Sequence, residues 1–124
     1  MEIKVTNVEQ SKLVSVDFDN LQFGRTFSDH MFVADFENGE WKNFQIKPYS
    51  HFSISPASAA LHYGQTIFEG LKAYRNKDGE VMLFRPEYNC QRLNDSAARM
   101  CMASIPEEIF MEGLRQLLKI DQEW

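Results

Sequence analysis

The residue types that most often do chemistry are sparse in this sequence, and their spacing disfavours several familiar sites. The three histidines, His30, His51 and His62, stand at no metal-binding spacing with cysteine or carboxylate side chains. No GxSxG frame offers a nucleophile elbow, and the six glycines are too dispersed for a phosphate-binding loop. We therefore predict no metal site and interpret each histidine as an ordinary packing or surface residue.

Two features remain as candidates for binding. The stretch LHYGQTIFEG, residues 61–70, gathers a His, a Tyr, a Phe and a Glu near two glycines. Arg92 lies on the polar stripe of a predicted helix that follows a predicted strand. Its planar, permanently charged guanidinium could bind an anion through two hydrogen bonds there. Taken by itself, a surface arginine is more simply explained by solvation or an ion pair, so Arg92 needs further support.

Composition limits the classes of protein that this chain can be. Its 124 residues are 44% apolar and include ten Phe, which is typical of one globular domain with a real core. Thirteen basic and 18 acidic side chains give a net charge of −5 without a basic cluster, which disfavours a nucleic-acid partner. We interpret Cys90 and Cys101 as reduced thiols packed as small hydrophobes in one helix, about 16 Å apart and too distant for a disulfide. Because no apolar run could cross a bilayer, a cytoplasmic protein is expected.

The strands that must position these residues are predicted in two hairpins. Asn38-Gly39 separates HMFVADF from EWKNFQI, and Asp78-Gly79 separates LKAYR from EVMLF. Both dipeptides suit a type I′ turn, which needs positive φ at both central residues. Residues 1–13 alternate weakly and are interpreted as an edge strand or an irregular lead-in. The loop of about twenty residues between the hairpins is long for a compact domain, and one helical turn is expected in it, with Pro56 at its first position.

Two helices are predicted in the last third of the chain. Pro86 and Glu87 suit the first turn of one helix, and the capping-box pair Ser104 and Glu107 predicts the start of the second. The expected buried stripes are Leu93, Ala97, Met100 and Cys101 on the first helix and Phe110, Leu114, Leu117 and Leu118 on the second. Gly113 weakens the second helix by up to about 1 kcal/mol relative to alanine. The predicted fold class is α+β, an antiparallel sheet of β-hairpins with two helices packed on one face.

Four sequence blocks in a fixed order carry a family resemblance. They are FGRTFSDHMF (residues 23–32), SPASAALHYGQTIFEGLKAY (55–74), LFRPEYNCQRLNDSAARM (83–100) and the closing IDQEW. Together they resemble the N-terminal domain of branched-chain amino acid aminotransferases, the fold-type-IV class of pyridoxal-phosphate enzymes. The FGRTFSDHM block is typical of the branched-chain enzymes rather than of their D-amino-acid transaminase relatives. The resemblance covers the chain from about Phe18 onward.

The resemblance implies roles for four side chains. Arg92 matches the family arginine that binds the phosphate of the cofactor, pyridoxal 5'-phosphate. Tyr63 matches the tyrosine that reaches across the dimer interface and helps to bind the α-carboxylate of the substrate. Phe23 and Phe68 match aromatics that line the pocket for the branched aliphatic side chain.

The resemblance also implies an activity that this chain does not complete by itself. The parent enzyme would be a cytoplasmic homodimer that exchanges the amino group of Leu, Ile or Val with 2-oxoglutarate. Its catalytic lysine, which forms the Schiff base with the cofactor, lies in a C-terminal domain that is absent from residues 1–124, and Lys72 receives no such role. We therefore predict an incomplete, inactive N-terminal domain that does not hold the cofactor tightly unaided. His62 and Glu69 match the family motif too, but they are interpreted as loop structure.

Two alternatives remain open. The chain could be a stand-alone assembly or anion-binding domain without catalysis, and the reading frame beyond Trp124 tests that interpretation. It could also come from a related fold-type-IV enzyme, either a D-amino acid transaminase or an aminodeoxychorismate lyase, which substrate profiling would separate.

Overall fold

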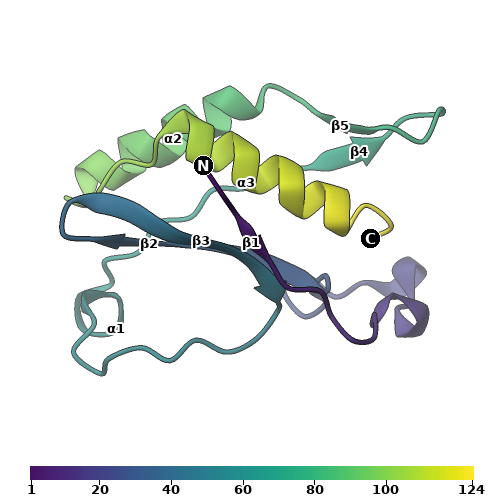
Figure 1. Cartoon of the computed structure of the whole chain (residues 1–124), viewed down its shortest axis with the longest axis horizontal. Helices are drawn as coiled ribbons and strands as arrows, with labels where there is room; N and C mark the ends of the chain where they lie inside the picture. The colour runs from purple at the N-terminus through teal and green to yellow at the C-terminus, as the bar shows by residue number, and fades with distance from the viewer. The chain divides into compact units, whose positions relative to one another are not determined.

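A computed structural model describes all 124 residues and divides the chain into two compact units. Unit 1 comprises Met1–Ser50 and Glu112–Trp124, and unit 2 comprises His51–Met111. The elements, labelled in Figure 1, confirm the α+β class. They are the strands β1 (Lys4–Val5), β2 (His30–Glu37), β3 (Glu40–Pro48), β4 (Ala73–Arg75) and β5 (Val81–Leu83), the helices α1 (Ala59–Tyr63), α2 (Pro86–Arg99) and α3 (Glu107–Ile120), and two short 3-10 helices, Leu13–Ser15 and Phe18–Asn20.

The sheet of unit 1 is mixed, with the strand order β1-β3-β2. β2 and β3 pair antiparallel around Asn38 and Gly39, whose φ angles of 54° and 87° confirm the predicted turn with two positive φ values. β1 pairs parallel with β3, so the lead-in is an edge strand, but the prediction of a purely antiparallel sheet is wrong. The physical reason is that no hairpin joins β1 to β3, so nothing in the connection forces the two strands to run in opposite directions.

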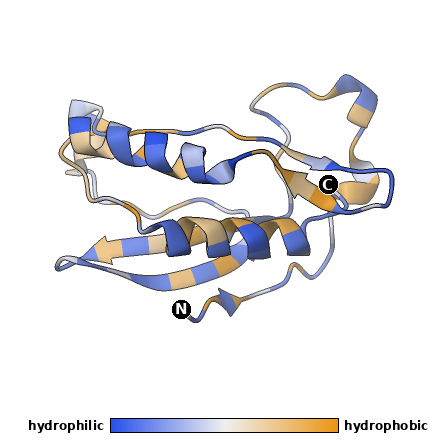
Figure 2. Cartoon of the chain, turned by 90° about the horizontal axis from the view of Figure 1, so that it is seen from above, coloured by the Kyte–Doolittle hydropathy of each residue, from blue (hydrophilic) through white to orange (hydrophobic).

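The core of unit 1 includes β3. Ile46, on this strand, is buried, and its neighbours along the strand are more exposed. Figure 2, coloured by hydropathy, shows apolar and polar residues as orange and blue bands that follow one another along β3 and along α3. Residues Glu112–Ile120 of α3 belong to this unit, and the helix packs on β2 where buried Gly113 meets the ring of Phe32.

A buried histidine ties three distant segments of unit 1 together. The Nδ1 atom of His30 lies 2.6 Å from Oδ1 of Asp121, and its Nε2 accepts a hydrogen bond of 3.1 Å from the backbone N–H of Val8. Because Nε2 accepts, Nδ1 carries the proton that is shared with the carboxylate. The backbone N–H of His30 donates to the other oxygen of Asp121, at 3.0 Å. His30 is therefore a satisfied structural residue of this unit.

The neighbouring Asp29 is buried and fully hydrogen-bonded. Its carboxylate accepts bonds from the Ser11 hydroxyl, the Lys12 backbone N–H and Nε1 of Trp124. Burial opposes ionisation of this carboxyl, but the three hydrogen bonds outweigh burial and hold its pKa below the ordinary 3.8. The closing IDQEW block thus anchors the last turn of the chain to the loop before β2.

Unit 2 contains the second hairpin, in a sheet of its own. β4 and β5 pair antiparallel, as predicted, but they form a separate two-stranded sheet. Their turn is not the predicted two-residue type, because the Asn76 side chain accepts hydrogen bonds from the backbone N–H groups of Asp78 and Glu80. Gly79, at φ 83°, closes the resulting three-residue turn.

The helical turn in the long loop begins later than predicted. A turn closed by the Ser58 N–H and the Ser55 carbonyl places Pro56 ahead of the helix, so α1 begins at Ala59. It ends at Gly64, whose φ of 61° is the left-handed conformation that glycine adopts most easily. Tyr63 is consequently the last residue of a helix rather than part of a loop.

One of the two longer helices begins where the sequence predicts. α2 starts at Pro86, whereas α3 starts at Glu107, later than a capping box that begins at Ser104 implies. The placement of both cysteines in one helix is wrong, because α2 ends at Arg99 and the exposed Cys101 lies beyond it at φ 54°. Backbone hydrogen bonds close the end of α2, since the N–H of Met102 donates to the carbonyl of Ala97, and the Asn94 amide exchanges two hydrogen bonds with the backbone of Ile105 beyond it. No helix in the chain combines the length and the apolar character needed to cross a membrane.

Candidate functional site

Beyond α1, the LHYGQTIFEG stretch continues as an extended segment that lies alongside α2. Gln65 Nε2 donates to the carbonyl of Met100, just beyond the end of α2, at 2.8 Å. Asn89 Nδ2, near the start of α2, donates to the carbonyl of Gly70 at 3.2 Å. The segment therefore runs beside the helix in the opposite direction. Its side chains alternate, with Gln65, Ile67, Glu69 and Leu71 partly buried and Thr66, Phe68, Gly70 and Lys72 exposed.

The partly buried face of this segment carries an ion pair between Glu69 and Arg92. The carboxylate of Glu69 accepts hydrogen bonds from Nε of Arg92, at 2.6 Å, and from Nη2 of the same guanidinium. It also accepts from the Gly70 N–H at 2.8 Å and from Asn89 Nδ2 at 3.4 Å. The Arg92 bonds lower the pKa of Glu69 to about 2, and the same pairing raises the pKa of Arg92. Both groups are therefore charged at neutral pH.

The two partners differ in exposure, and this difference sets what the pair can do. The Glu69 side chain is 9% exposed, whereas the Arg92 side chain is 67% exposed. Glu69 uses the edge of the guanidinium formed by Nε and Nη2. The other edge, formed by Nη1 and the second hydrogen of Nη2, still presents a planar pair of donors. Such an edge matches two oxygens of a phosphate or carboxylate group.

Two further predicted site residues lie in unit 2 with their rings exposed. Tyr63, at the end of α1, is 85% exposed, and Phe68, directly before Glu69, is 92% exposed. Phe68 directly precedes Glu69, the residue that holds Arg92. Tyr63, by contrast, makes no hydrogen bond to Arg92. Rings this exposed leave their apolar faces open to contact with another surface.

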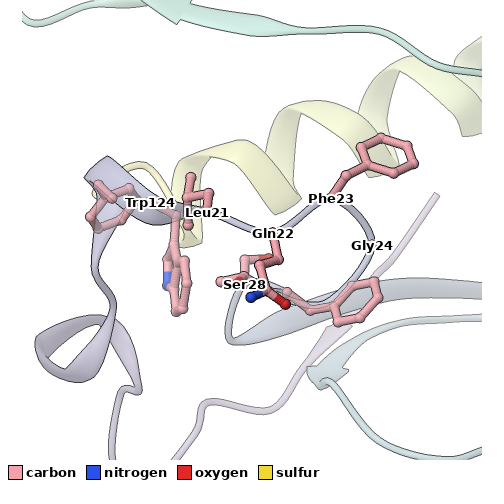
Figure 3. Close-up of a pocket in the computed structure, with 9 residues that line it drawn as sticks. Leu21, Gln22, Phe23, Gly24, Ser28 and Trp124 are labelled. Atoms are coloured by element: carbon pink, nitrogen blue, oxygen red, sulfur yellow. The ribbon is translucent and has the colours of Figure 1, made fainter.

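The fourth predicted residue, Phe23, belongs to unit 1 and lines an apolar hollow of about 590 Å³. The hollow is formed by the loop before β2 and by the last residue of the chain; its lining is Phe18, Leu21, Gln22, Phe23, Gly24, Thr26, Phe27, Ser28 and Trp124. Figure 3 shows the ring of Phe23 pointing away from Trp124, and this ring is fully exposed. Phe27 is held in place on the same loop by stacking on Tyr49 at 4.5 Å.

Sequence reasoning missed one residue of the unit 2 cluster and underrated another. Glu69 was expected to serve loop structure only, but it is the group that fixes Arg92. Asn89 was not singled out, although its amide clamps the backbone of the segment. Polarity does not alternate in QTIFEGLK, so the pattern gave little signal; an extended conformation, once assumed, places Glu69 on the same face as Ile67 and Leu71.

Comparison with known proteins gives the chain a set of close relatives. No family model matches it. It is 46% identical over 125 aligned positions to branched-chain-amino-acid aminotransferase 2 of Bacillus subtilis, a match that covers the whole of this chain. It is 48% identical to branched-chain-amino-acid transaminase 1 of the same organism and 48% identical to the branched-chain-amino-acid aminotransferase of Mycolicibacterium smegmatis, over 87% and 85% of this chain.

These matches occupy only part of each relative. The aligned regions make up 34%, 31% and 29% of the relatives' own lengths. The chain therefore spans about a third of the length of the curated relatives that it matches.

Proposed function

Because the chain belongs to the branched-chain amino acid aminotransferase family, we propose that it forms the N-terminal part of such an enzyme. The complete enzyme would transfer the amino group of Leu, Ile or Val to 2-oxoglutarate, as a cytoplasmic homodimer. It would use pyridoxal phosphate, which supplies the electron sink that makes amino transfer possible. The catalytic lysine would lie in the C-terminal two-thirds of the polypeptide.

The observation that carries this proposal is the exposed guanidinium of Arg92. Its charge is permanent, its orientation is fixed by Glu69, and one donor edge remains for an anion. A dianionic phosphate is the ligand that such a planar fork suits best. The residues present therefore fit the role of holding the phosphate group of the cofactor.

The aromatic residues fit the remaining binding roles. The exposed hydroxyl of Tyr63 can donate a hydrogen bond to a substrate carboxylate in a partner subunit. The rings of Phe23, in unit 1, and of Phe68, in unit 2, are both exposed, and each can offer an apolar wall to an aliphatic side chain. Burial against such a wall contributes about 0.8 kcal/mol per CH₂ group, which favours Leu, Ile and Val over smaller amino acids.

The test compares two proteins: the complete polypeptide that the gene encodes and the 124-residue chain. Each is mixed with pyridoxal phosphate, and visible absorbance is recorded before and after leucine is added. We expect the complete polypeptide to show a band of bound cofactor that leucine discharges, and to transfer the amino group to 2-oxoglutarate. We expect neither band nor turnover from the 124-residue chain.

The other outcomes separate the competing interpretations. Turnover by the 124-residue chain, shown by mass to be free of longer protein, would contradict the assignment of the catalytic lysine to another part of the polypeptide. A reading frame that stops after Trp124, together with no cofactor band, would support a stand-alone anion-binding domain instead. A complete polypeptide that acts on D-amino acids but not on leucine would identify a different fold-type-IV enzyme.

A further inference from the structure

We propose that Glu69 is a positioning residue, which orients the Arg92 fork toward the phosphate of the cofactor and holds Phe68 in register with it. This inference rests on the proposed function, because it concerns the same binding site. It assigns a role to a carboxylate that the family resemblance left as loop structure. Glu69 touches neither cofactor nor substrate in this role, since it acts through Arg92 and through the backbone of its own segment.

The geometry of the ion pair with Glu69 orients the guanidinium of Arg92. An arginine side chain can rotate about several bonds, and an exposed one loses much of that freedom when it binds an anion. Glu69 removes part of this freedom in advance, because it grips Nε and Nη2 together and so fixes the plane of the guanidinium. The fork that remains faces outward from α2 with its direction already set.

The carboxylate of Glu69 is itself held in place. The Gly70 N–H and the Asn89 amide hold it from two further sides, and its side chain is 9% exposed. Gln65 and Asn89 also fasten the segment to the two ends of α2. Glu69 is therefore a fixed point, and Arg92 is the mobile partner that it restrains.

Fixing Glu69 also sets the direction of its chain neighbour Phe68. In an extended segment, consecutive side chains point to opposite faces, so fixing Glu69 against α2 directs Phe68 to the other face. Phe68 is indeed 92% exposed, although it is next to a largely buried residue. One anchor thus sets both the phosphate-binding donor and one wall of the proposed substrate pocket.

A competing role for Glu69 makes the opposite prediction. If the carboxylate occupied Arg92 as an internal substitute for phosphate, removing it would strengthen cofactor binding. The use of the Nε edge argues against that role, because the edge formed by Nη1 and Nη2 stays available while Glu69 is bound. The two roles therefore differ in the sign of one measured quantity.

The experiment measures dissociation constants for pyridoxal phosphate and for pyridoxal, which lacks the phosphate, by equilibrium dialysis with the complete polypeptide. We compare the unchanged protein with Glu69→Gln, Glu69→Ala and the matched control Glu112→Gln. The control weakens another Glu–Arg ion pair, the one that Glu112 makes with Arg115 on α3. We expect Glu69→Ala to weaken binding of pyridoxal phosphate about tenfold, and Glu69→Gln to weaken it less, as loss of a charge-assisted orientation implies. Binding of pyridoxal should not change, and Glu112→Gln should change neither constant.

A double-substitution cycle with Arg92→Ala separates positioning from general stability. If Glu69 acts through Arg92, Glu69→Ala should have no further effect on phosphate binding once Arg92 is alanine. Should Glu69→Ala fail to fold, as judged by circular dichroism, Glu69→Gln carries the same comparison because it preserves the shape of the side chain. Tighter or unchanged pyridoxal phosphate binding in the Glu69 variants, or an equal loss for pyridoxal, would overturn the inference. An unchanged protein that fails to bind pyridoxal phosphate at all would instead overturn the proposed function.

Discussion

Replacing Gly113 by alanine should destabilise the protein, although alanine is the better helix former. Gly113 lies in the middle of α3 and is buried against β2. A Cβ atom added there would stand 2.6 Å from Cε1 of Phe32, 2.7 Å from Cδ1 and 2.8 Å from Cζ. Three ring atoms are therefore closer than real Cβ contacts allow, so the ring or the helix must move.

The magnitude follows from two opposing terms. Alanine gains about 1 kcal/mol over glycine in a helix interior, and overpacking a formed core costs about 1–3 kcal/mol. The overlap involves one whole edge of the Phe32 ring, which places the cost in the middle of that range. We expect a net loss of about 1 kcal/mol in the free energy of unfolding. For a chain of 124 residues this corresponds to a melting temperature lower by about 4 °C.

Thermal and urea unfolding, followed by far-UV circular dichroism, measure this change. The control is the same Gly113→Ala substitution in a Phe32→Leu background, where the shorter side chain leaves room for the new methyl group. There alanine should raise the free energy of unfolding by up to about 1 kcal/mol, so the sign reverses. If Gly113→Ala stabilises the protein with Phe32 intact, the reasoning about the contact between α3 and β2 is wrong.

Three further predictions concern other parts of the chain. Trp124→Phe keeps an aromatic side chain but removes the N–H donor to Asp29, so we expect a lower urea midpoint at pH 7 and a smaller decrease at an acidic pH where Asp29 is protonated. Because the pKa of Asp29 is lower in the folded state, its ionisation stabilises the fold above about pH 4, and this stability is lost as pH falls through the folded pKa. In unfolding curves recorded over a series of pH values, Asp29→Asn should therefore make the loss of stability at acidic pH less steep. Iodoacetamide should alkylate the exposed Cys101 in minutes and leave Cys90 largely unmodified in the folded chain, because Cys90 is buried and burial raises its pKa. Equal labelling of the two cysteines, measured by mass spectrometry after digestion, would contradict this prediction.

Local patterns were sufficient to predict much of the fold. Asn38 and Gly39 specified a hairpin because two consecutive residues with positive φ have few other uses between apolar runs. Pro86 marked the start of α2, since proline fits the first helical turn and little else in a helix. The parallel pairing of β1 was beyond reach, because no feature within two residues of chain states which strand it meets or in which direction.

In the candidate site, too, the sequence indicated some residues, whereas one contact became visible only in the structure. The sequence pointed to Arg92, Tyr63, Phe23 and Phe68 as candidates through the order of four motif blocks, which depends on residue identity alone. It could not indicate the ion pair of Glu69, because the partner of that carboxylate is 23 residues away and is set by how the segment lies along α2. The hydrogen bonds that fix it form only when helix and segment are both in place.

Gly113 shows most clearly what each level decides. By itself the sequence determined that the glycine weakens a helix, because propensity depends only on the residue and its neighbours in the chain. Only the tertiary structure decided that the glycine is needed, because Phe32, far away in the sequence, occupies the space that a side chain would fill. Local conformational preferences can be read along the chain, whereas the volume available to a side chain is set by residues that folding brings together.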